Sequence, residues 1–125
     1  MMIDAALHAQ LDGFLAQPDH NRWLHGRFLK VYLRKNKRWL SGQPPNNVVE
    51  WRTHAVNCVD FANMADMHPK HQLQGIFSGF FDYLENKHLA IYVELVGPFQ
   101  LQWYFDRRGY VREPGVNNCY YRLAS

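Results

Sequence analysis

The feature that most restricts the fold is an alternation of strand-like and helix-like apolar patterns in the second half of the chain. Residues 73–86 predict a helix with one apolar stripe, made of Ile76, Phe77, Phe80, Phe81 and Leu84. Residues 89–96 are apolar and β-branched, as expected of a buried strand. Another helix is expected over 99–108, with Pro98 at its first position and Gly109 at its end. This order indicates an α/β or α+β fold.

The other segments predict a mixture of helices and strands around this unit. Helices are expected over residues 3–16 and, more briefly, over 19–25. Residues 28–34 alternate as a half-buried strand does, and Lys35-Asn36 is expected to turn the chain into a second strand over 37–41. Extended structure is expected over 48–53 and 57–67, and closing strands over 110–112 and 118–123. The segment 43–47, with Pro44-Pro45, is typical of a surface loop.

The size and composition favour a single domain over residues 1–125. Aromatic residues make up 15% of the 125 residues, enough bulk for a substantial core. Only Cys58 and Cys119 are present, which argues against a disulfide scaffold and for a reducing, cytoplasmic location. We expect no membrane partner, because no apolar run is long enough to span a bilayer. The net charge of +3 is compatible with a phosphate-bearing partner without requiring one.

The segment from Met67 to Gly79 carries the strongest chemical signal. A strand is expected to stop at Pro69, and the following helix begins with Gly75 and Gly79 in its first turns. No carboxylate occurs between Met67 and Phe81, whereas Lys70 and His71 lie close by. The first backbone N–H groups of a helix can bind an anion, so this segment could hold a phosphate or pyrophosphate. The alternative is that the glycines only permit close packing.

The same segment resembles motif A of the GNAT N-acyltransferases, (R/Q)-x-x-G-x-(G/A), in the stretch His68-Pro69-Lys70-His71-Gln72-Leu73-Gln74-Gly75-Ile76-Phe77. Ile91-Tyr92-Val93-Glu94 is similar to the fifth strand of that family. Residues 104–110 are similar to its penultimate helix and the Gly-aromatic step after it. The likeness covers about residues 56–123. It implies a single GNAT-like domain with a central, mostly antiparallel mixed sheet, helices on both faces, and two strands that splay to admit a pantetheine arm.

The resemblance also implies a substrate and site residues. Acetyl-coenzyme A would be the acyl donor, and an amine would be the acceptor. The donor would contact backbone or side chains at a set of positions, namely Ala65, Met67, Gln72, Leu73, Gln74, Gly75, Ile76, Phe77 and Ser78. Glu94 matches the family's catalytic base. Tyr104 is the other catalytic candidate, since Phe105 stands where many members carry the tyrosine that protonates the thiolate. Phe77 and Gly97-Pro98 also depart from the family pattern.

Several charged residues keep alternatives open. Glu94 lies in an apolar strand, so it is either functional or paired with a cation such as Arg52 or Arg112. Asp60 and Asp66 are expected on a solvated strand face rather than in a substrate cleft. A basic cluster beside Trp39 consists of Arg34, Lys35, Lys37 and Arg38. Solvated turn charges explain this cluster better than a nucleic-acid site does, and it could equally attract an acidic protein.

Three functions therefore stand side by side. The first is acetyl-coenzyme A-dependent N-acyltransfer to an amine, by direct attack. The second is a non-catalytic binding or inhibitor protein on the same scaffold, such as one encoded by a phage. The third and weakest is nucleic-acid binding. No metal site is expected, because the seven histidines are scattered and no convergent ligand set is evident.

Overall fold

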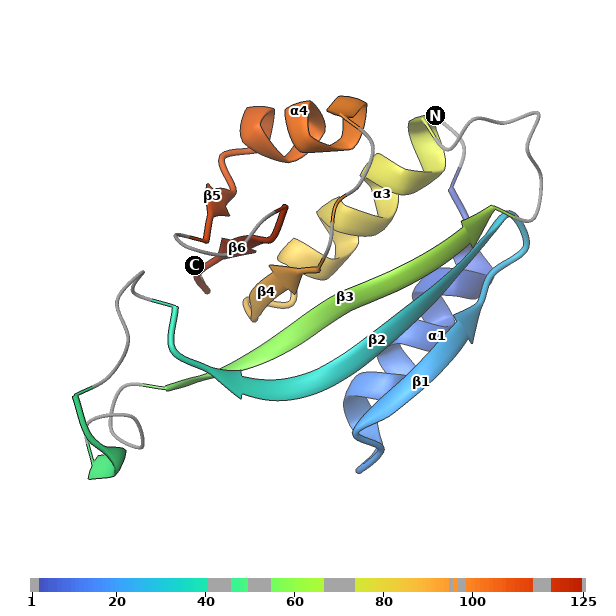
Figure 1. Cartoon of the computed structure of the whole chain (residues 1–125). Coiled ribbons are helices and arrows are strands. Elements are labelled where there is room, and N and C mark those ends of the chain that lie inside the picture. The colour runs from blue at the N-terminus through green and yellow to red at the C-terminus, as the bar shows by residue number, and fades with distance from the viewer. Residues whose placement is uncertain are drawn as a thin grey trace.

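The computed structural model describes residues 3–40, 46–49, 55–66, 74–94, 96, 99–113 and 118–124. In this part of the chain, one six-stranded sheet is combined with three helices, α1 (Ala5–Ala16), α3 (Gln74–Glu85) and α4 (Phe99–Arg107) (Figure 1). The strands are β1 (Asn21–His25), β2 (Leu29–Arg38), β3 (Val56–Asp66), β4 (Ala90–Val93), β5 (Val111–Arg112) and β6 (Tyr120–Arg122). The predicted α/β class is confirmed.

The sheet is mixed, with the strand order β1-β2-β3-β4-β6-β5. Strands β3 and β4 are parallel, and every other neighbouring pair is antiparallel. A parallel pair requires a crossover connection, and helix α3 lies within the connection between β3 and β4. The mostly antiparallel mixed sheet expected from the sequence is therefore confirmed.

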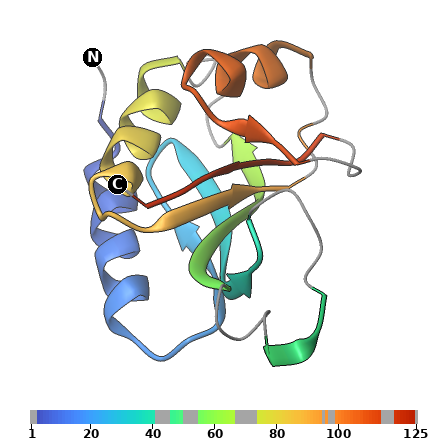
Figure 2. The same ribbon diagram turned by 90° about the vertical axis from the view of Figure 1, so that its left-hand side faces the viewer.

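One hydrophobic core joins the sheet to all three helices. Alternate residues of β2, including Val31 and Leu33, face this core together with Phe14 of α1, Phe81 of α3 and Phe105 of α4. Figure 2 shows α1 and α3 next to each other on one side of the sheet. The expectation of helices on both faces is thus not met by the described helices. Opposite-face side chains form their own polar network and a smaller cluster, which holds Leu40, Cys58, Ala90, Tyr92, Cys119 and Tyr121.

Helix α1 is tied to the β1–β2 hairpin by one buried carboxylate. Asp4 caps the helix by accepting a hydrogen bond from the Leu7 N–H at 3.1 Å. The same carboxylate accepts bonds from the backbone N–H groups of Arg27, Phe28 and Leu29 at 2.8–3.2 Å. Gly26 makes this approach possible, because a Cβ atom there would lie 2.2 Å from Asp4 Oδ2.

Two predictions in the first half of the chain are wrong. Residues 19–25 were expected to be helical, but Asn21–His25 is strand β1, which pairs with β2 and buries Leu24 in the core. The turn expected at Lys35-Asn36 is absent, since β2 runs without a break through both residues to Arg38. Pairing with β3 along the whole of β2 overrides the local turn preference of Asn36.

The remaining helix and strand predictions agree with the described residues to within a few positions. Helix α4 ends before Gly109, which has a φ of +83° and so adopts the left-handed conformation that glycine favours. Most of the segment 48–53 lies outside the described residues, and its first two residues are helical rather than extended. Among the described helices, none has both the length and the apolar character needed to cross a membrane.

Candidate functional site

Strands β3 and β4 run side by side for only a short distance and then part. Their pairing extends from Cys58 and Ala90 to Phe61 and Val93, and the Glu94 N–H donates one more hydrogen bond to the Phe61 carbonyl at 3.0 Å. Beyond this point β3 continues along β2 to Asp66, as Figure 1 shows, whereas β4 has ended. A gap therefore opens in the sheet at Phe61 and Glu94.

A cavity of about 200 Å³ lies at this gap. Strand β3, the end of β4 and helices α3 and α4 line it through Phe61, Ala62, Asn63, Met64, Phe77, Val93, Glu94, Val96, Leu101 and Phe105. Most of these side chains are apolar, and Glu94 is the single ionisable residue in the set. The cavity is therefore small, with a largely apolar lining that contains one ionisable residue.

Glu94 is held by two arginines of β2, so the alternative of an ion-paired glutamate is observed. Arg34 Nη2 and Arg38 Nη2 both donate to Glu94 Oε1, the second of them at 3.1 Å. The cations suggested by the sequence were different ones: Arg112 pairs with Asp106 at 2.8 Å, and Arg52 lies outside the described residues. The Glu94 side chain keeps 18% of its surface exposed, and both arginines bind the same oxygen, Oε1.

Asp60 completes this network and is fully buried, which corrects its expected place on a solvated face. Arg38 Nε and Nη2 donate to its two oxygens at 2.8 and 2.7 Å, and the Asn36 amide donates to Oδ2 at 3.0 Å. Arg34 Nε lies 3.8 Å from the same oxygen. The hydrogen bonds that Arg38 donates to Asp60 hold the pKa of Arg38 above its ordinary value, although burial alone would lower it. Two arginines thus neutralise two carboxylates.

Sequence reasoning missed the partners in this network, although a signal was present. Arg34, Asn36 and Arg38 are spaced two residues apart, and a strand places such residues on one face. The assumed turn at Lys35-Asn36 hid this pattern. The correct explanation for Arg34 and Arg38 is ion pairing across the sheet rather than solvated turn charge.

The predicted donor-binding residues are placed in part. Phe77 is 4% exposed and lines the cavity, with its ring packed edge-on against Phe61 and Phe81. Ile76 is buried in the core, Gly75 is half-buried in the first turn of α3, and that turn contains no acidic residue. Ala65 is exposed on β3, one residue beyond the cavity lining. Met67, Gln72 and Leu73, together with the side chain of Gln74, lie outside the described residues, as do Gly97-Pro98.

Tyr104 points toward helix α3 rather than lining the cavity. Its hydroxyl donates to Ser78 Oγ at 3.0 Å and accepts a hydrogen bond from Arg108 at 3.1 Å. Burial raises the pKa of Tyr104 above its ordinary value, and the contacts with Ser78 and Arg108 oppose only part of that shift. Its neighbour Phe105 does line the cavity. One step along a helix rotates a side chain by about 100°, which explains why the two rings point differently.

No group of three or more histidine, cysteine or acidic side chains that could hold a metal ion occurs in the part of the chain that the structure describes. Comparison of the chain with protein-family models, with curated proteins and with solved structures finds no match in any of the three.

Proposed function

We propose that the protein is an acetyl-coenzyme A-dependent N-acyltransferase that transfers the acetyl group directly to an amine. The observation that carries this proposal is the parting of β3 and β4 at Phe61 and Glu94, with an apolar cavity beside it. The sequence resemblance to GNAT N-acyltransferases implies that a pantetheine arm enters between two splayed strands at this position. The resemblance and the cavity are independent observations that agree on one place in the fold.

The start of helix α3 supports the donor end of the proposal. Its first turn has no acidic residue, so the positive end of the helix dipole is not neutralised there. Gly75 lies in this turn, where the absence of a side chain allows a phosphate to approach the backbone. Phe77 turns its ring into the core, so the ring does not project from the helix start. The pyrophosphate would lie at the helix start and the acyl chain in the cavity.

Glu94 supports the acceptor end. The two arginine contacts are made by Oε1, and Oε2 is left to accept a proton from the attacking amine. The amine nitrogen forms a bond to the thioester carbonyl carbon, and the carbon–sulfur bond then breaks. The acetylated amine and the coenzyme A thiolate leave, and the thiolate takes its proton from solvent or from the protonated carboxylate. Tyr104 has no direct part in this scheme, because its hydroxyl is bonded to Ser78 and Arg108.

A second function, a non-catalytic binding or inhibitor protein on this scaffold, is favoured by the same ion pairs. Arg34 and Arg38 both bind Glu94 Oε1, which gives this carboxylate a structural role in joining β2 to the end of β4. Phe105, a residue that cannot donate a proton, faces the cavity. In this alternative the network serves stability alone, and acetyl-coenzyme A does not bind.

Nucleic-acid binding has less support than either of these two functions. Arg34 and Arg38 are engaged with Asp60 and Glu94, which leaves two of the four basic residues of the cluster for other contacts. A cytoplasmic location fits the proposal, because Cys58 and Cys119 are both free, buried thiols and free thiols are usual in a reducing compartment.

A tryptophan placed in the cavity tests the proposal. Ala62 lines the cavity, so Ala62→Trp should fill it and weaken acetyl-coenzyme A binding at least about tenfold in isothermal titration. Ala9→Trp adds the same ring to an exposed position of α1 and should leave the affinity unchanged. Equal affinity of both folded variants would overturn the assignment of the cavity.

A further inference from the structure

The second strand changes character along the face that packs against the helices. Its core-facing positions are apolar at Leu29, Val31 and Leu33 and then become basic at Lys35 and Lys37. This change occurs beyond the ends of helices α1 and α3. A strand of ten residues is about 33 Å long, whereas a helix of twelve residues is about 18 Å long. The sheet face beyond the ends of α1 and α3 is therefore left uncovered by the described helices.

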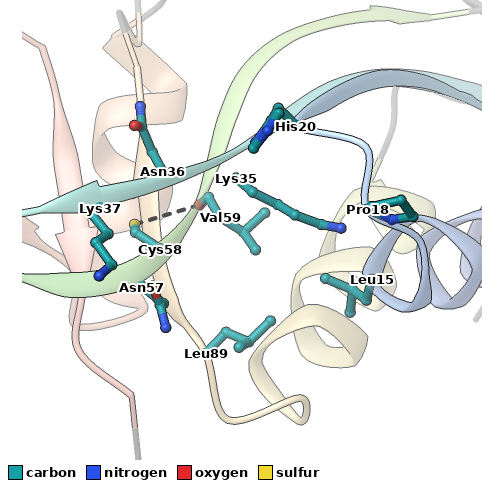
Figure 3. Close-up of a pocket in the computed structure, with 10 residues that line it drawn as sticks. All are labelled: Leu15, Pro18, His20, Lys35, Asn36, Lys37, Asn57, Cys58, Val59 and Leu89. Atoms are coloured by element: carbon teal, nitrogen blue, oxygen red, sulfur yellow. Dashed lines mark hydrogen bonds between the residues drawn. The ribbon is translucent and has the colours of Figure 1, made fainter.

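A cavity of about 560 Å³ occupies this uncovered end. Figure 3 shows Leu15 and Pro18 from the end of α1, Leu89 from the segment before β4, and Val59 from β3 around an apolar floor. The Lys35 side chain extends toward Pro18 at one end of the cavity. Lys37 and Asn57 lie at the opposite end. None of these residues lines the cavity where β3 and β4 part, so the two cavities are distinct.

The charged side chains among the described residues that line this cavity are of one sign. No acidic residue is among those that line it. Lys37 is exposed, and none of the ion pairs found in the described part of the chain involves it. The Lys35 ammonium donates to the Gln17 carbonyl and lies 4.6 Å from the centre of the Phe14 ring. Neither contact brings a negative charge, so both ammonium groups remain able to pair with an anion.

We propose that this cavity binds a small free monocarboxylate with an apolar chain. The apolar chain would pack on Leu15, Val59 and Leu89, and the carboxylate would meet the Lys37 ammonium. The volume lies within the range of about 300–1,000 Å³ that is usual for small-molecule sites. Charge complementarity selects an anion, and a single carboxylate matches the exposed Lys37 at one end of the apolar floor, while Lys35 adds positive charge toward the other end. The proposal does not depend on the acyltransferase function.

Three eight-carbon probes of different charge test this site. Octanoate, 1-octanol and octylamine are titrated below their aggregation limits, with backbone amide chemical shifts as the readout. Octanoate should bind saturably, shift the signals of Lys37, Asn57 and Leu89, and bind about tenfold more tightly than 1-octanol. Octylamine should bind most weakly. Absence of saturable octanoate binding, or equal affinity for octanoate and 1-octanol, would overturn the proposal.

A matched pair of lysine variants separates a specific site from general attraction. Lys37→Gln should weaken octanoate binding about fivefold and leave 1-octanol binding unchanged. Lys30→Gln removes one positive charge from the opposite face of β2, where Lys30 packs on Trp23, and should have no effect. Equal losses in the two variants would contradict the site. Binding of a leucine-containing acidic peptide that octanoate does not displace would contradict it too, in favour of a protein partner.

Discussion

Arg38 and Asp60 form two parallel hydrogen bonds between neighbouring strands, from Nε to Oδ1 at 2.8 Å and from Nη2 to Oδ2 at 2.7 Å. Asp60 is 0% exposed, so its charge depends on the arginines for compensation. The change Asp60→Asn would leave Arg38 without this partner and should lower the free energy of unfolding by about 3 kcal/mol. Chemical denaturation followed by circular dichroism measures the loss.

The exposed pair Arg22–Asp19 supplies the control for this prediction. Its side chains are 38% and 42% exposed, and the pair lies outside the buried network. Asp19→Asn should therefore change the free energy of unfolding by no more than about 1 kcal/mol. Similar losses for both variants would show that burial of Asp60 has no energetic importance.

Glu94→Gln distinguishes the two leading functions. If Glu94 accepts the proton of the amine, this change should lower turnover by about 10²–10⁴-fold and leave acetyl-coenzyme A affinity nearly unchanged. Loss of the ion pairs should also lower the melting temperature, so activity is compared at a temperature where both proteins are folded. Arg34→Gln is the matched control, because it breaks one of the same ion pairs and keeps the carboxylate. The non-catalytic binding function would be supported if the wild-type protein shows no transferase activity toward any amine tested and Glu94→Gln melts at a lower temperature.

Asp4 should make the stability of the protein depend on pH in the acidic range. Burial alone would raise its pKa, but four backbone N–H donors hold the pKa of Asp4 below its ordinary value of 3.8. A lowered folded-state pKa contributes stability above pH 3.8, and that contribution is lost as the pH falls through the folded-state value. Asp4→Asn should therefore be less stable at pH 6, and its stability should fall less steeply between pH 5 and about pH 2. Parallel pH profiles for both proteins would refute this role.

Two glycines should respond to alanine in opposite directions. At Gly26 an added Cβ would lie 2.2 Å from Asp4 Oδ2 and 2.6 Å from the Leu29 carbonyl oxygen. Gly26→Ala should therefore destabilise the protein by about 1–3 kcal/mol. At Gly13, inside α1, an added Cβ meets nothing within 4 Å, so Gly13→Ala should stabilise it by up to about 1 kcal/mol. Thermal unfolding of the two variants checks both signs.

The sequence predicts the helices well, because their signals are local. The apolar stripe of α3 repeats within its own segment, and Gly109 marks the end of α4 without reference to any other part of the chain. Strand β1 was missed for the opposite reason. Its five residues become a strand by pairing with β2, and nothing within those five residues predicts that pairing.

Part of the candidate site could also be predicted from the sequence, and part of it could not. Glu94 was found because a carboxylate is exceptional in an apolar strand, and the start of α3 was found because it lacks acids. Arg38 and Asp60 are 22 residues apart in the chain, so only the strand register brings them together. The parting of β3 and β4 likewise depends on where two distant strands stop pairing. The resemblance to an acyltransferase motif implied that gap, whereas apolar periodicity alone does not.

The central claim is that acetyl-coenzyme A binds where the start of α3 meets the gap between β3 and β4. Isothermal titration of the wild-type protein and of Gly75→Glu tests it most directly. Gly75→Glu adds bulk and negative charge to the first turn of α3, and Gly13→Glu adds the same group to the last turn of α1. We predict saturable binding at one site per chain for the wild type and for Gly13→Glu, and its loss in Gly75→Glu. Absence of binding to the wild-type protein, or unaltered affinity in Gly75→Glu, would contradict the account.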